Sequence, residues 1–103
     1  MTVISAEELR SRLNAGEAVH LLDVREPHEH AEFNIGGTLL PLGKILGMQV
    51  EEIEDWKNEE VICYCRSGQR SMQASLMLET FGFTNVKNLT GGMLGWQAAG
   101  YQP

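Results

Sequence analysis

Three short segments with strand character, separated by segments with helical spacing, constrain the fold of this chain more than any other feature. Residues 18–24 and 60–64 are largely apolar, residues 86–89 form a further expected strand, and all three have the usual length of strands. The first is apolar apart from His20 and Asp23, a pattern typical of a strand that is buried on both faces of a parallel sheet. We therefore predict an α/β fold with a mostly parallel sheet and helices on both of its faces.

The segments between these runs carry start and stop signals of helices. Ser5 and Glu8 form a capping box, Pro27 suits a first helical position, and Ser71 is expected to cap the helix that it opens. Trp96 is expected to anchor the last helix in the core. The expected helices cover residues 6–14, 27–33, 42–46, 49–58 and 71–81 and a last stretch from Gly91-Gly92 through Ala99, with a further extended segment over 38–40.

Length and charge limit the classes of protein to which the chain can belong. Its 103 residues suffice for one core, so we expect a single domain over residues 1–103. The net charge of −6 provides no basic stripe for nucleic acid or an anionic membrane surface. The chain has no signal-peptide pattern at its start, and its apolar runs are far shorter than a membrane span. A cytoplasmic protein is therefore expected.

The segment CRSGQRS, residues 65–71, has the features of a reactive site. It follows a predicted buried strand and precedes a helix, where open parallel sheets present their ligand sites. Backbone N–H groups of such a turn, the helix dipole and the charges of Arg66 and Arg70 should lower the pKa of Cys65. Gly68 can adopt the backbone angles that a tight cradle requires. We expect a thiolate at Cys65 and a cradle that also suits an oxyanion.

The two cysteines lie in different sequence contexts. A disulfide between Cys63 and Cys65, which are separated by one residue, would be strained, so both are expected to be free thiols in a reducing compartment. A free cysteine is often just a small buried apolar residue. The neighbouring arginines favour a reactive role for Cys65, whereas Cys63 lies in an apolar strand and is expected in the core, with a resolving thiol as the alternative.

Other polar residues are given structural interpretations. His20, His28 and His30 are too few and too irregularly spaced for a metal site, so no metal and no cofactor are expected. Asp23 and Arg25, at the end of the first buried run, either orient the reactive loop or pair with each other. The structural pairing is favoured, since such networks are often structural.

Three parts of the sequence, in this order, resemble the rhodanese family. The first is LDVREP, residues 22–27, followed by FNIGG and LPL at residues 33–37 and 40–42; the second is residues 65–71; the third is LTGGMLGW, residues 89–96. The resemblance implies a three-layer fold with about five parallel strands between helices. It also implies a cysteine that takes a sulfane sulfur from a donor such as thiosulfate, holds it as a persulfide and passes it to cyanide or a thiol.

Carried over to this chain, the resemblance assigns the catalytic position to Cys65. The substrate-binding cradle is then formed by Arg66, Ser67, Gly68, Gln69 and Arg70. The partners implied are a small-molecule sulfur donor, a thiol or cyanide acceptor and a possible sulfur-relay protein. The chain departs from the family at Asn34 and Gly36, where members commonly have histidine and proline.

Two other functions remain open from the sequence. Cysteine phosphatases also combine a cysteine, an anion cradle and an arginine before a helix, but they place five residues between cysteine and arginine. Cys65 and Arg70 have four residues between them. Rhodanese-like folds also occur as non-catalytic interaction modules, and inactive copies usually lack the cysteine that this chain retains.

Overall fold

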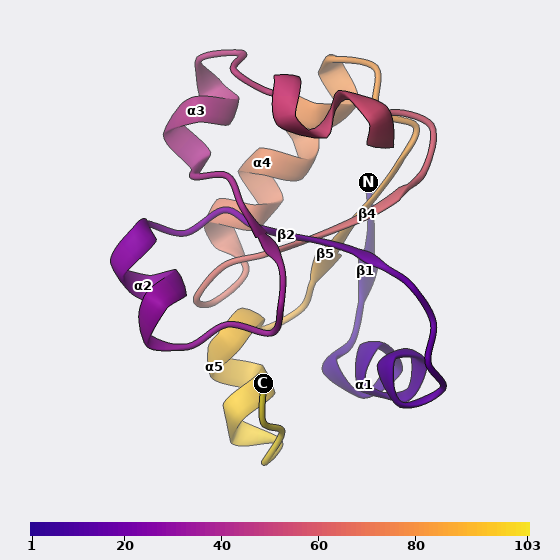
Figure 1. The fold of residues 1–103 in the computed structure, drawn as a ribbon, viewed down its shortest axis with the longest axis vertical. Helices are drawn as coiled ribbons and strands as arrows, with labels where there is room; N and C mark the ends of the chain where they lie inside the picture. The colour runs from indigo at the N-terminus through magenta and orange to yellow at the C-terminus, as the bar shows by residue number, and fades with distance from the viewer.

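The structure, a computed structural model, describes all residues from 1 to 103. Its centre is a five-stranded parallel sheet with the strand order β1-β5-β4-β2-β3, which confirms the predicted α/β class (Figure 1). The strands are β1 (Thr2–Ile4), β2 (His20–Asp23), β3 (Thr38–Leu39), β4 (Glu60–Tyr64) and β5 (Asn85–Leu89). The middle strand, β4, lies between β5 and β2.

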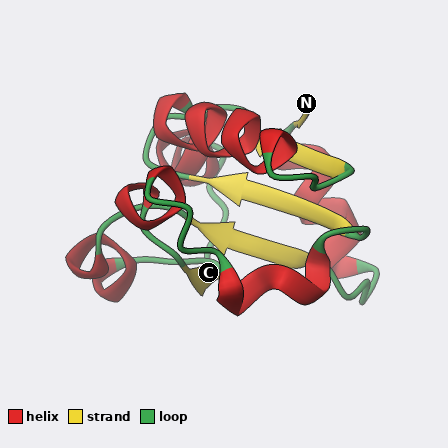
Figure 2. Cartoon of the chain, turned by 90° about the horizontal axis from the view of Figure 1, so that it is seen from above, coloured by secondary structure: helices red, strands yellow, loops and turns green.

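Helices cover both sides of the sheet, as the view in Figure 2 shows. They are α1 (Ala6–Asn14), α2 (Pro27–Glu32), α3 (Leu42–Leu46), the 3-10 helix η1 (Glu51–Trp56), α4 (Gln69–Thr80) and α5 (Gly92–Ala98). Ser5 caps α1, because its hydroxyl accepts the N–H of Glu8. No helix combines the length and the apolar character that a membrane span requires.

The two faces of the sheet bury separate apolar clusters. Successive residues of a strand point to opposite faces, so β4 contributes Cys63 to one cluster and Ile62 and Tyr64 to the other. The cluster with Cys63 also contains Cys65 and is covered by α3, η1 and α4. The second cluster is covered by α1 and α5, with Trp96 fully buried as predicted.

The structure differs from the sequence-based predictions at several elements. No strand was predicted at β1, which pairs with β5 at one edge of the sheet. The helix expected over residues 49–58 is the shorter η1, kinked at Ile53. The prediction that Ser71 caps α4 is wrong, because α4 starts at Gln69 with Gly68 as its N-cap. Gly68 has φ of 107°, a conformation that closes the preceding loop tightly before the helix.

The parallel arrangement brings distant parts of the chain together at one edge of the sheet. Strands β2, β4 and β5 end at Asp23, Tyr64 and Leu89, and neighbouring parallel strands point the same way. The segments that follow these strands therefore meet at the carboxyl edge. They include the loop that begins with Cys65.

Candidate active site

Cys65 lies directly after β4, and hydrogen-bond donors surround its sulfur. The residue is only 1% exposed, and its Sγ accepts hydrogen bonds from the Gly68 N–H at 3.0 Å and the Ser71 hydroxyl at 3.4 Å. Burial alone would raise the pKa of Cys65. The Ser71 hydroxyl and the N–H groups of Ser71, Gly68 and Ser67 outweigh that effect, so the pKa lies below its usual value. The loop therefore favours a thiolate.

Cys63, two residues earlier, is in the opposite situation. It is fully buried in the cluster beneath α4, and burial raises the pKa of its thiol to about 12, with a smaller opposing effect from Ser75. Both cysteines are free. The expected core position of Cys63 is confirmed.

A residue from the neighbouring strand holds the reactive loop in place. Asn88 on β5 is buried, its Nδ2 donates to the Gly68 carbonyl at 3.1 Å, and its Oδ1 accepts the hydroxyl of Ser71. The one hydroxyl proton of Ser71, in the first turn of α4, is thus shared between Asn88 Oδ1 and the sulfur of Cys65. The sequence analysis did not identify Asn88, because nothing in the local pattern shows which residue of β5 faces the loop.

The start of α5 fixes the orientation of two peptide groups in the same loop. The N–H groups of Met93 and Leu94 donate to the carbonyls of Cys65 and Arg66, each at 2.9 Å. The approach requires a glycine at position 92, where φ is 56° and a Cβ would lie 2.4 Å from the carbonyl oxygen of Cys65. With these carbonyls bound to α5, the N–H groups that follow are available to the sulfur. The glycine pair had been interpreted only as a turn.

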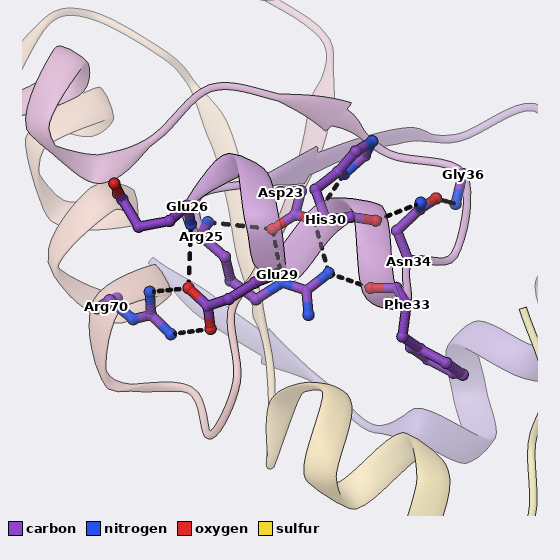
Figure 3. Close-up of polar contacts among 9 residues, drawn as sticks. All are labelled: Asp23, Arg25, Glu26, Glu29, His30, Phe33, Asn34, Gly36 and Arg70. Atoms are coloured by element: carbon purple, nitrogen blue, oxygen red, sulfur yellow. Dashed lines mark hydrogen bonds and ion pairs between the residues drawn. The ribbon is translucent and has the colours of Figure 1, made fainter.

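The two arginines of the loop have different environments. Arg70 makes a bidentate ion pair with Glu29 of α2, with Nη–Oε distances of 2.8 and 2.9 Å (Figure 3). This pairing, more than any other effect, raises the pKa of Arg70, and the nearby Cys65 adds to it. Arg66 is exposed and makes no side-chain hydrogen bond or ion pair within the chain. The pKa of Cys65 is therefore lowered mainly by hydrogen bonds, which include the expected backbone N–H groups, and not by the charges of Arg66 and Arg70 that were also expected to lower it.

Asp23 and Arg25 pair with each other at the end of β2, as the sequence analysis favoured. The Arg25 guanidinium donates to both carboxylate oxygens of Asp23, at 2.9 and 2.8 Å, and to the carbonyl of Phe33 (Figure 3). His30 Nδ1 lies 2.8 Å from Asp23 Oδ2. Burial would raise the pKa of Asp23, but hydrogen bonds from Arg25 and His30 hold it below its usual value. This network ties α2 and the chain after it to the sheet.

Asn34 and Gly36 build the turn at which the chain departs from the family pattern. Asn34 donates to the carbonyl of His30 and accepts the N–H of Gly36, both at 2.8 Å. Gly36 has φ of 91°, which a proline ring cannot adopt. The two departures therefore compensate each other in one local turn.

The three histidines do not come together. His30 lies at Asp23, whereas His20 stacks on Trp56 with its Nε2 2.6 Å from Glu59. His28 is exposed on α2. No group of three histidine, cysteine or acidic side chains is arranged to hold a metal ion.

A pocket of about 160 Å³ opens beside the reactive loop. Arg66 contributes one wall from the loop, and the remaining walls come from α2, α5 and their neighbours. Its lining residues are Arg25, Glu29, Glu32, Phe33, Arg66, Met93, Leu94 and Gln97. The pocket combines apolar side chains with charges of both signs.

Comparisons with known proteins find related sequences and a similar fold. The family model described as rhodanese-like domain matches residues 5–99. A sulfurtransferase from Allochromatium vinosum is 40% identical over 98 residues, covering 94% of this chain and 89% of its own length. The putative sulfur carrier protein YrkF from Bacillus subtilis is 33% identical, over 90% of this chain and 49% of its own length. The human single domain sulfurtransferase TSTD1 has a similar structure, with a TM-score of 0.79, 26% identity and coverage of 95% and 96% of the two chains.

Proposed function

The chain belongs to the rhodanese-like domain family, and we propose that it is a sulfurtransferase that carries sulfane sulfur on Cys65. Its relatives support sulfur transfer in general. The finer proposal is that Cys65 takes sulfur from a donor such as thiosulfate and becomes a persulfide. That persulfide then gives its outer sulfur to cyanide or to a thiol.

The observation that carries this proposal is the ring of donors around one low-pKa thiol. The Cys65 thiolate attacks the outer sulfur of thiosulfate, the S–S bond breaks, and sulfite leaves with the bonding electrons. The negative charge then resides on the outer sulfur of the persulfide. We propose that this sulfur binds in the cradle formed by the backbone of Arg66, Ser67, Gly68, Gln69 and Arg70.

The second half-reaction uses the same features. A thiolate or cyanide attacks the outer sulfur, and Cys65 leaves as a thiolate. A lower pKa makes Cys65 a better leaving group and keeps it ionised for the next cycle, so no general base is required.

The partners of the proposed reaction are a small sulfur donor and a small thiol or cyanide acceptor, without a cofactor. The similarity to a putative sulfur carrier protein supports a relay protein as a further acceptor. We propose the cytoplasm as the location, because two free cysteines and a persulfide suit a reducing compartment.

A coupled assay tests the proposal. With thiosulfate and cyanide the protein should release thiocyanate over many turnovers, and Cys65→Ser should abolish the release while circular dichroism stays unchanged. Absence of turnover with every sulfane donor would favour the non-catalytic interaction module. Hydrolysis of an aryl phosphate that disappears in Cys65→Ser would instead support the cysteine phosphatase.

A further inference from the structure

Most of the positive charge near the reactive loop is neutralised within the chain. Arg25 is bound to Asp23, and Arg70 is bound through both of its Nη atoms to Glu29 (Figure 3). Only Arg66 remains without a carboxylate partner, and it lines the pocket together with Glu32, which has no cationic partner either. The charges that face an incoming sulfur donor therefore nearly cancel.

Acidic residues around Arg70 strengthen this conclusion. Besides Glu29, the carboxylate of Glu26 is close enough to act on the charge of Arg70. The Glu29 carboxylate also accepts the N–H of Glu26 at 3.0 Å, so hydrogen bonds from both Glu26 and Arg70 hold it in place. In this geometry both Nη atoms of Arg70 are paired with Glu29. The chain as a whole also carries a net charge of −6.

We propose that the site is matched to a sulfur donor of low charge, an alkyl persulfide, and that Glu29 disfavours dianionic thiosulfate by neutralising Arg70. Glu29 is then a specificity-determining residue that acts through Arg70 and needs no contact with the donor. This inference rests on the proposed function, because it concerns the donor that loads Cys65. Thiosulfate would still serve as a donor, with lower efficiency.

The two donors differ in the charge that the site must hold and not in the bonds exchanged. With an alkyl persulfide, R–S–S⁻, the Cys65 thiolate bonds to the outer sulfur and the S–S bond breaks. The thiolate R–S⁻ leaves with the bonding electrons and takes a proton from water, and Cys65 keeps the sulfur as a persulfide anion. With thiosulfate the same exchange releases sulfite, so the site holds one more negative charge throughout. A nearly neutral site therefore favours the persulfide.

The test compares kcat/KM for loading by thiosulfate and by the persulfide of 2-mercaptoethanol, which is charged only at sulfur. Glu29→Gln keeps an oxygen that can accept the Glu26 N–H but removes the charge opposite Arg70. It should raise kcat/KM for thiosulfate by about fivefold or more and change the value for the persulfide much less. Arg70→Gln should lower thiosulfate use, because it leaves the carboxylate of Glu29 unpaired.

The double variant Glu29→Gln/Arg70→Gln separates charge balance from direct binding. If the pair acts only through its net charge, thiosulfate use in the double variant should return close to the wild-type value. If Arg70 itself holds the donor, the double variant should be as poor as Arg70→Gln, and the proposal is overturned. Glu17→Gln is the matched control: Glu17 pairs with Arg12 before β2, at the opposite edge of the sheet, and should leave the donor ratio unchanged.

Two further outcomes distinguish this proposal from the proposed function. Wild-type protein that loads faster from thiosulfate than from the persulfide, with a ratio unaffected by Glu29→Gln, refutes the donor preference and leaves sulfur transfer standing. If neither donor adds sulfur to Cys65, sulfur transfer itself is refuted. Thermal unfolding of each variant establishes that α2 and the loop remain folded.

Discussion

Cys63 and Cys65 point to the same face of the sheet, two residues apart, yet the pKa values of their thiols are shifted in opposite directions. Cys63 is surrounded by apolar side chains, so burial raises its pKa to about 12. Cys65 is almost as buried, but the sulfur meets the Ser71 hydroxyl and the N–H of Gly68. Hydrogen-bond donors, and not exposure, therefore decide which thiol ionises.

Ser71→Ala should raise the pKa of Cys65. A hydrogen bond to a charged group is worth about 1.5–3 kcal/mol, and one pKa unit is about 1.4 kcal/mol, so a rise of about one to two units is expected. The rate of alkylation by iodoacetamide, measured against pH, reports this pKa: the midpoint should move to higher pH.

Ser75→Ala is the matched control for Ser71→Ala. Ser75 lies one turn later on α4, and its hydroxyl donates to the carbonyl of Ser71 and not to Cys65. Its pH profile should coincide with that of the wild type. Equal shifts of the Cys65 pKa in both variants would show that the effect comes from loosening α4. The role assigned to the Ser71 hydroxyl would then be refuted.

At the residue scale, the sequence predicted the direction of both thiol pKa shifts and part of their causes, namely the backbone N–H groups at Cys65 and burial at Cys63, but not the Ser71 hydroxyl. The sequence shows two arginines in the five residues after Cys65, but Arg70 is paired with Glu29, which is 41 residues away in sequence. Asn88 reaches the loop from another strand. Such contacts depend on how α2 and β5 approach the loop, which no local pattern specifies.

At the scale of elements, α5 supports the loop that follows β4. Its first N–H groups bind the carbonyls of Cys65 and Arg66, and this contact is possible because Gly92 carries no side chain. The Gly91-Gly92 pair therefore shapes the reactive loop as well as opening a helix. A change at Gly92 should disturb the sulfur cradle more than a change at a glycine outside the reactive loop, such as Gly16.

Gly92→Ala should reduce sulfur loading of Cys65 at least about tenfold, since misaligned catalytic groups cost factors of that order or more. The new Cβ would overlap the carbonyl of Cys65, and the positive φ adds strain of about 1–2 kcal/mol. Gly16→Ala carries the same backbone strain, with φ of 80°, but its Cβ would meet nothing within 4 Å.

Loading rates and urea unfolding should be measured for both glycine variants. Gly16→Ala should lose stability of about 1–2 kcal/mol and keep wild-type loading. If Gly92→Ala also loads like the wild type while remaining folded, α5 does not shape the cradle.

The order and type of most elements could be predicted from the sequence, whereas the edge strand β1 could not. The range Ala6–Asn14 of α1 matches the prediction, because Ser5 and Glu8 provide a strong local start. Strand β1 is only three residues long with just Ile4 buried, so it has no apolar run to detect. Its strand conformation depends on pairing with β5.

At the scale of the whole molecule, the two ends of the sheet have separate polar networks. The carboxyl end holds the loop around Cys65, and the amino end holds Glu60 between Arg12 and Lys87. Hydrogen bonds from Arg12, followed by the smaller effect of Lys87, lower the pKa of Glu60 to about 2 against burial, which raises it. Glu60 therefore links α1, β4 and β5 without touching the reactive loop.

Glu60→Gln should reduce the free energy of unfolding at pH 7 by about 1–2 kcal/mol, less than the full shift implies because solvent screens the pair. Since the folded pKa is lowered from 4.5 to about 2, this stabilisation is present above pH 4.5 and is lost as the pH falls toward 2. The difference in the free energy of unfolding between the wild type and Glu60→Gln, measured by urea unfolding, should therefore be smaller at pH 3 than at pH 7. Glu52→Gln, at an exposed position without an ion pair, should have the same free energy of unfolding as the wild type at both pH values.

The measurement that tests the central claim most directly is the location of the transferred sulfur. After loading with a sulfane donor, mass spectrometry of the intact protein should show the mass of one added sulfur atom, and peptide analysis should place it on Cys65. Cys63→Ser should load like the wild type, and Cys65→Ser should not load. Sulfur found on Cys63, or a folded Cys63→Ser variant that cannot pass sulfur to cyanide, would contradict a single-cysteine carrier and require a relay through both thiols.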